Sequence, residues 1–140
     1  MQTEILAPAA LLIIWSLVVL LWMASTRMRN LSKHGVDLGG SPGGRGQDLE
    51  GVLPDKINWK AHNYTHLMEQ PTLYYATVLI LAMVGYSRDV LLAAWIYTIV
   101  QIAHSLWQGL VNTIPVRVTL FLLSTFALIY MAVQAMVATI

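Results

Sequence analysis

The residues of this chain best suited to chemistry lie between Lys60 and Tyr75, where one carboxylate and two imidazoles precede an uncharged apolar run. Glu69 is the acid of this group, and the segments long enough to cross a membrane contain no other. An ionised carboxylate is expensive inside a bilayer, so it has to be paired, hydrated or used. We therefore expect Glu69 to serve a function or to be essential for assembly.

Two stripes of polar side chains accompany this acid. On its own segment, His62, His66 and Glu69 follow the i, i+4, i+7 spacing of one helical face. On the next apolar segment, the polar residues follow the i, i+3, i+7, i+11 spacing: Gln101, His104, Gln108 and Asn112. Polar stripes on neighbouring membrane helices are most stable when they face each other inside the bundle. Arg117 follows at the start of the last apolar segment, within reach of the end of the second stripe.

These stripes also have simpler interpretations. Polar residues between transmembrane helices often only hydrogen bond to one another, at about 0.6 kcal/mol a pair. Gln101, Gln108 and Asn112 are open to this interpretation, and a lone His104 in an apolar helix is commonly a satisfied core histidine. A metal site is a further interpretation, because the first stripe offers two imidazoles and a carboxylate opposite His104. Any polar helical face produces this spacing by chance, so we predict no metal site.

The composition identifies the elements that must position these residues. The chain has 140 residues, of which 57% are hydrophobic and 11% charged, and its mean hydropathy is +0.63. Globular domains carry about 25% charged residues, so this chain is expected to be an integral membrane protein. Four uncharged stretches are long enough to cross a hydrocarbon core of about 30 Å. They predict one all-α domain, residues 1–140, folded as a four-transmembrane-helix bundle with helices at about 5–29, 55–86, 90–112 and 115–139.

The basic residues predict the orientation in the membrane. Seven of the eight lie in or beside the first and third connections, and Arg88 alone lies in the second. By the positive-inside rule, loops one and three are expected to be cytoplasmic and both termini outside, in a multi-pass protein of the inner or plasma membrane. The opening Met-Gln-Thr-Glu lacks a basic region, so the first helix is not expected to be a cleaved signal. A net charge of +1 offers no argument for nucleic acid as a partner.

The first loop, at about residues 30–54, holds seven of the nine glycines. Its run from Gly39 to Gly46 has the glycine content of a phosphate-binding loop, but it follows no strand and lacks the Gly-Lys-Ser/Thr ending. We interpret it as a flexible cytoplasmic connector, with a lid or a contact surface as the alternative. The chain has no cysteine, so any sulfur chemistry has to come from a cofactor.

Three parts of the sequence together resemble the MAPEG superfamily, the membrane-associated proteins of eicosanoid and glutathione metabolism. Arg27-Met28-Arg29 ends the first helix as the family's basic pair does, and the segment 66–71 lies where the family has Asn-x-x-Glu followed shortly by proline. The segment 102–117 resembles, without gaps, a family stretch that runs from Val-Ala-His-Thr to Ala-Pro-Ile-Arg. The resemblance covers essentially the whole chain.

The resemblance implies a homotrimer that holds glutathione at the subunit interface near the cytoplasmic face. Glu69 matches the family acid that meets the amino end of glutathione, and Arg117 matches the arginine that polarises its sulfur. Arg27 or Arg29 matches the helix-one arginine contributed at the interface.

Other family contact positions carry different residues here. His66 replaces the asparagine before the acid, and His62 replaces the arginine one turn earlier; a second alignment places Lys60-Ala61-His62 on the family's Arg-Ala-His with two inserted residues. His104 matches the family histidine, while Gln108 replaces the tyrosine one turn later and Gln101 an arginine.

The function that this resemblance implies is that of a glutathione-dependent transferase or peroxidase. It would act on a lipophilic electrophile at the membrane, with membrane lipid and further copies of the chain as its other partners. A non-catalytic MAPEG-fold protein that binds lipid or glutathione is the alternative.

Overall fold

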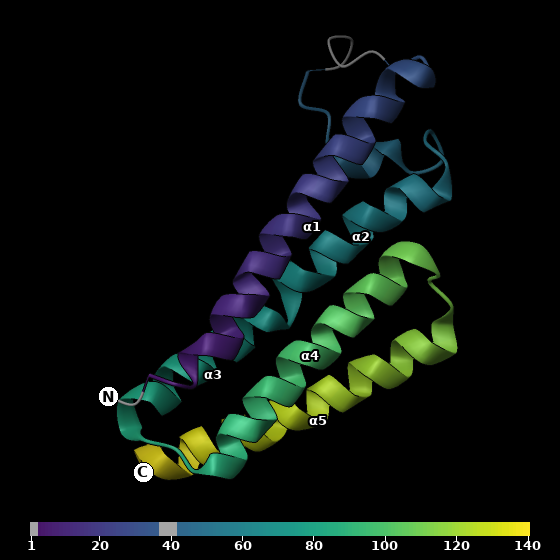
Figure 1. The fold of residues 1–140 in the computed structure, drawn as a ribbon. Coiled ribbons are helices and arrows are strands. Elements are labelled where there is room, and N and C mark those ends of the chain that lie inside the picture. Colours follow the sequence, from purple (N-terminus) through teal and green to yellow (C-terminus); the bar gives the residue numbers. More distant parts are fainter. Residues whose placement is uncertain (1–2, 37–41) are drawn as a thin grey trace.

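The protein is a bundle of long helices in the computed structural model, which describes residues 3–36 and 42–140. The helices are α1 (Leu6–Lys33), α2 (Asp55–Glu69), α3 (Pro71–Val84), α4 (Arg88–Leu110) and α5 (Ile114–Thr139), with a short 3₁₀ helix η1 (Gly46–Leu49) after α1 (Figure 1). Because α2 and α3 follow each other directly, the described residues form four spans that are long and apolar enough to cross a membrane. The predicted all-helical bundle of four spans is confirmed.

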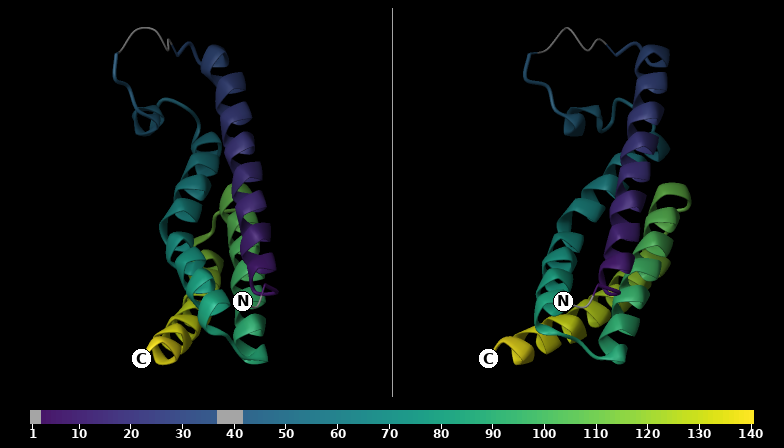
Figure 2. Two further views of the ribbon diagram at one scale, coloured as in Figure 1. Left: turned by 90° about the vertical axis from the view of Figure 1, so that its left-hand side faces the viewer. Right: turned by 60° about the vertical axis from the view of Figure 1, so that its left-hand side comes forward.

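The second span is interrupted beside Glu69, where α2 ends and α3 begins at Pro71. A proline has no backbone N–H, so the carbonyl of Leu67 loses its helical donor. In the next turn, the Thr72 hydroxyl donates to the Glu69 carbonyl at 2.7 Å. The span bends at this point, as Figure 2 shows, and Glu69 therefore lies at a break rather than inside one continuous helix.

The other helix ends follow from local backbone preferences. The first helix extends to Lys33, beyond the expected end at about residue 29. The second span ends at Val84, because Gly85 has a φ of 99° that continues no right-handed helix. Pro115 lies in the first turn of α5. Backbone N–H groups of a first turn have no acceptor within the helix, so a proline there costs the helix no hydrogen bond.

The bundle is arranged as two antiparallel pairs that pack on each other. α1 packs against α2 and α4, and α5 packs against α4 and α3 (Figures 1 and 2). Both termini lie at the same end, as an even number of spans requires. At that end the stacked rings of Tyr74 and Tyr97, 4.2 Å apart, fill the core. The Thr98 hydroxyl bonds both to the Tyr74 hydroxyl and to the Pro8 carbonyl, which ties α1, α3 and α4 together.

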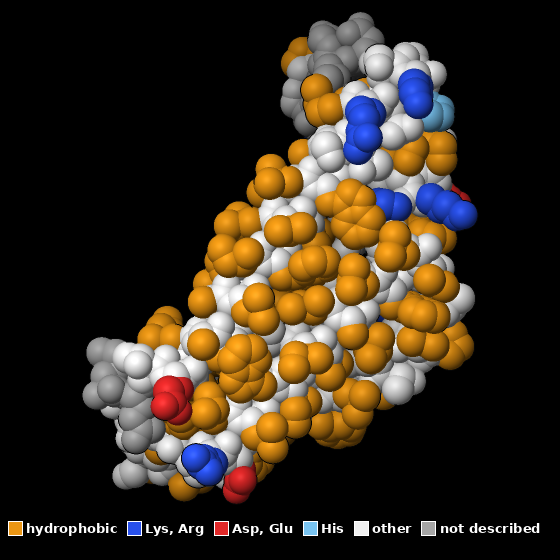
Figure 3. All heavy atoms as spheres, in the orientation of Figure 1, with side chains coloured by type: hydrophobic (Ala, Val, Ile, Leu, Met, Phe, Trp, Pro, Cys, Tyr) orange, Lys and Arg blue, Asp and Glu red, His pale blue; other side chains and the backbone are white. Residues whose placement is uncertain are grey.

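The outer surface is that of a membrane protein. Apolar side chains cover the middle of the face in Figure 3, and most of its Lys and Arg side chains lie toward the end that carries the first loop. Exposed leucine, isoleucine, valine and methionine on every span support a lipid environment. The glycine run predicted as a connector is described only in part, because Gly39 and Gly40 lie outside the described residues.

Candidate functional site

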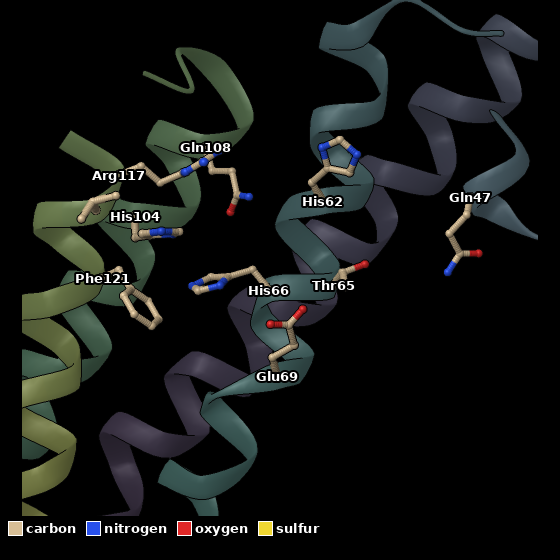
Figure 4. Close-up of a pocket in the computed structure, with 10 residues that line it drawn as sticks. Gln47, His62, Thr65, His66, Glu69, His104, Gln108, Arg117 and Phe121 are labelled. Atoms are coloured by element: carbon tan, nitrogen blue, oxygen red, sulfur yellow. The ribbon is translucent and has the colours of Figure 1, made fainter. Parts of the chain in front are cut away.

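A cavity of about 520 Å³ opens between α2, α4 and the first turns of α5, toward the end of the bundle that carries the first loop (Figure 4). Its lining comes from four elements: Gln47 of η1, His62, Thr65, His66 and Glu69 of α2, His104 and Gln108 of α4, and Arg117, Val118 and Phe121 of α5. The two polar stripes therefore meet, and six of the eight candidate residues share one cavity.

The α2 wall carries the helical face predicted from the sequence, with His62, His66 and Glu69 on successive turns (Figure 4). The Glu69 side chain is exposed in the single chain, and no ion pair to its carboxylate forms within the described residues. A carboxylate in an apolar span needs a partner or water. Its charge is therefore available to a cationic group that enters the cavity.

The α4 wall is almost fully buried and polar. His104 is 2% exposed and Gln108 is 8% exposed. The His104 ring stacks on the His66 ring with centroids 4.2 Å apart, so α2 and α4 touch across the cavity floor. His66 Nε2, His104 Nδ1 and Gln108 Oε1 are buried and have no hydrogen-bond partner among the described residues. Buried polar atoms are normally paired, so this floor is suited to a polar ligand.

Arg117 supplies the positive charge of the cavity from the first turn of α5. Its Nη1 donates to Asn112 Oδ1 at 2.6 Å, and no carboxylate forms an ion pair with it within the described part of the chain. The N-terminus of a helix carries about half a positive charge from its aligned peptide dipoles. Arg117 and α5 together therefore make one corner of the cavity strongly favourable for an anion.

Behind the floor lies a hydrogen-bond network that includes Gln70, a residue that was not among the candidates from the sequence. Gln70, at the α2–α3 break, accepts from the Tyr97 hydroxyl at 3.1 Å and donates to the Thr125 hydroxyl at 2.9 Å. Gln101 is fully buried and donates to Ser124 at 3.0 Å. Gln101 thus joins α4 to α5 within the core. This contact agrees with the simpler interpretation of the second stripe, in which its polar residues only hydrogen bond between helices. The position of Gln70 between an acid and a proline in an apolar run was the signal available in the sequence.

The two arginines of the first helix lie away from this cavity in the single chain. Arg27 Nη2 donates to the Gly46 carbonyl at 3.1 Å and lines a second cavity of about 850 Å³ between α1 and residues 42–52. Arg29 is exposed, and its Nε donates to the Ser25 carbonyl. Neither side chain lines the cavity that contains Glu69 and Arg117.

The end of the first loop is held against the bundle, which sequence periodicity did not reveal. The Asn58 side-chain amide donates to the carbonyls of Leu49 and Leu53 at 3.2 and 3.3 Å. His62 contacts the Glu50 carboxylate, and these contacts hold the segment from which Gln47 joins the cavity lining. The described part of the loop is therefore folded, and one of its residues belongs to the site.

The residues of the first stripe do not assemble a metal centre in the part of the chain that is described. No group of three or more His, Cys, Asp or Glu side chains there is placed to hold an ion. His62 contacts the loop carboxylate of Glu50, whereas His66 stacks on His104. The cavity thus presents one acid, one arginine and unpaired imidazole and amide atoms.

Comparison with known families identifies the chain over nearly its full length. The model of the MAPEG family matches residues 5–137. No curated protein sequence and no solved structure matches the chain significantly.

Proposed function

Because the chain belongs to the MAPEG family, we propose that it binds glutathione in the cavity between α2, α4 and α5 and uses it on a lipophilic electrophile. Membership associates the protein with membrane-bound glutathione and eicosanoid metabolism at a general level. The observation that carries the finer proposal is that Glu69 and Arg117, from different spans, line one cavity of about 520 Å³. Sites for small molecules typically measure roughly 300–1,000 Å³.

The charges in the cavity suit glutathione, which has two carboxylates, one ammonium and one thiol. Glu69 would hold the ammonium group, since its carboxylate has no ion-pair partner within the described residues. His62 and Gln47 also line the cavity, and there they would hydrogen bond to the peptide. The unpaired atoms of His66, His104 and Gln108 would meet the remaining polar groups.

Arg117 would act on the sulfur. When bound, glutathione supplies a thiol that attacks an electrophile or reduces a peroxide. Arg117 and the N-terminus of α5 favour the ionised form of such a thiol, because positive charge stabilises a thiolate. The apolar residues Val118 and Phe121 on the next turns would admit an apolar substrate beside it.

The exposure of Glu69 supports assembly with further copies of the chain. In the single chain this acid is exposed on an apolar span, where an ionised carboxylate would face lipid. A neighbouring subunit would cover it, in agreement with the homotrimer that the family resemblance implies. In such a trimer Arg27 or Arg29 would reach the cavity of another subunit. Loops one and three would lie on the cytoplasmic side of the inner or plasma membrane.

A non-catalytic binding protein is the second candidate, and Gln101 is the observation that favours it. This residue stands where the family has an arginine, yet it is fully buried and bonded to Ser124. The cavity therefore receives one cation fewer from α4. Lipid that co-purifies with the oligomer, together with no conjugation of any electrophile tested, would favour this candidate.

The test of the proposed function is glutathione binding to the detergent-solubilised protein. Ligand at about ten times its Kd stabilises the folded state by about 1.4 kcal/mol, so glutathione should raise the thermal unfolding midpoint. Arg117→Ala should abolish most of this rise, whereas Thr139→Ala, at the far end of α5, should preserve it. The absence of any shift at millimolar glutathione in the unmodified protein would overturn the proposal.

A further inference from the structure

Asn112 adopts a backbone conformation that few residues other than glycine tolerate. Its φ is 58°, and no other non-glycine residue in the described part of the chain has a positive φ. It follows the C-terminal end of α4, where its N–H donates to the Trp107 carbonyl at 2.7 Å. Glycine is the usual residue at such a helix end, because it adopts this conformation without strain. Asparagine is the usual alternative to glycine there, so the turn accepts Asn112 but does not require a partner for its side chain.

The side chain of Asn112 does have a partner, and it is the arginine of the cavity. Asn112 Oδ1 accepts from Arg117 Nη1 at 2.6 Å. A guanidinium group only donates hydrogen bonds, so the amide oxygen rather than its nitrogen faces Arg117. Hydrogen bonds from a charged donor are stronger than those between neutral groups.

The turn that carries this oxygen is held in place on both sides. The Trp107 indole Nε1 donates to the Thr113 hydroxyl at 3.0 Å, and the Arg117 backbone N–H donates to the Thr113 carbonyl at 3.3 Å. These bonds connect the last turn of α4 to the first turn of α5. The orientation of the guanidinium is thereby coupled to the junction of two spans.

An amide at this position directs Arg117 without cancelling its charge. A carboxylate would bind the guanidinium as an ion pair and compete with any incoming anion. The described residues provide no such ion pair for Arg117. The titratable groups that line the cavity beside it are His62, His66 and Glu69 of α2 and His104 of α4.

We propose that Asn112 is a positioning residue, which uses its left-handed backbone and amide oxygen to direct the full charge of Arg117 toward the sulfur of bound glutathione. This inference rests on the proposed function. It gives the side chain of Asn112 a role beyond the left-handed turn, which glycine would adopt equally well.

The test uses Asn112→Gly, which keeps the backbone conformation and removes the oxygen. Bound thiolate is followed by its ultraviolet absorbance as the pH is raised, in the solubilised protein with glutathione. We expect the titration midpoint to rise by about one pH unit, equivalent to about a tenfold lower thiolate fraction below the midpoint. Asn112→Asp, which keeps the acceptor but neutralises the charge, should raise the midpoint at least as far. Asn30→Ala, which loses an amide bonded to the Thr26 carbonyl on α1, should leave it unchanged.

Two further measurements separate positioning from a general structural role. Asn112→Gly should keep the thermal unfolding midpoint of the unmodified protein, and it should bind S-methylglutathione, which has no ionisable thiol, with unchanged affinity. The kcat/KM for glutathione with chlorodinitrobenzene should fall by about tenfold, mainly through kcat.

The outcomes distinguish this inference from the proposed function. An unmodified protein with no glutathione-dependent thiolate signal would overturn the proposed function and this inference with it. A normal signal in the unmodified protein and an identical midpoint in Asn112→Gly would overturn this inference alone. An equal loss of affinity for glutathione and S-methylglutathione in Asn112→Gly would also overturn it, because the effect would then not concern the thiol.

Discussion

Gly109 allows α1 to approach α4 closely beside the cavity, and its replacement by alanine tests that packing. A Cβ at this position would lie 2.9 Å from the Trp22 ring atoms Cη2 and Cζ3 and 3.3 Å from Asn63 Nδ2. Asn63 is fully buried, and the Trp22 ring lies 5.4 Å from the Lys60 ammonium. The added methyl group therefore requires the indole ring of Trp22 to move.

The magnitude follows from two opposing effects. Forcing an extra methyl group into a packed contact costs about 1–3 kcal/mol. Replacing glycine by alanine inside a helix recovers up to about 1 kcal/mol through helix propensity. We expect Gly109→Ala to destabilise the protein by about 1 kcal/mol, which lowers the unfolding midpoint by about 4 °C for a domain of this size.

The assay is thermal unfolding in detergent followed by far-ultraviolet circular dichroism, with Trp22→Leu as the second background. Leucine removes the ring atoms that the new Cβ would meet, so Gly109→Ala should become stabilising in that background. The reversal of sign is the decisive feature. An equal stabilisation in both backgrounds would refute the contact, because propensity alone would then account for the result.

Two more variants address the network and the loop. Gln70→Met should destabilise the protein by about 1–3 kcal/mol, because it leaves the buried Tyr97 hydroxyl without a hydrogen-bond partner, and thermal unfolding measures this loss. Unchanged stability would show that the network contributes nothing. Arg27→Met should release the segment at Gly46 and speed tryptic cleavage after Arg45 in limited proteolysis, while Arg29→Met, which removes an exposed side chain, should not. Equal cleavage rates in both would refute the role of Arg27 as an anchor of the loop.

The candidate site was predictable where it depended on helical repeats. His62, His66 and Glu69 share a cavity wall because the helical repeat places them on one face. His104 meets His66 because polar side chains avoid lipid and so face the interior of the bundle. The catalytic and binding roles of these residues remain predictions.

Other parts of the site depended on turns and loops, which have no repeat to read. Gln47 reaches the cavity only because the first loop folds back along α2. Arg27, a candidate from its family position, bonds to this loop within the single chain. The sequence placed Arg117 within reach of Asn112 at the end of the second stripe, but the hydrogen bond that joins them arises from the turn between α4 and α5.

Four membrane-spanning helices, with an acid, imidazoles and an arginine near one end, were evident from the amino-acid sequence, because span length, hydropathy and helical spacing are local properties of the chain. The packing of the helices was needed to show which of these groups share a cavity, how Gln70 joins three helices and which atom bonds to Arg117. Those contacts depend on where helices end and where the chain turns. The positive φ of Asn112 and the missing N–H of Pro71 lie at two such points, and neither alters the spacing of polar and apolar residues along the sequence.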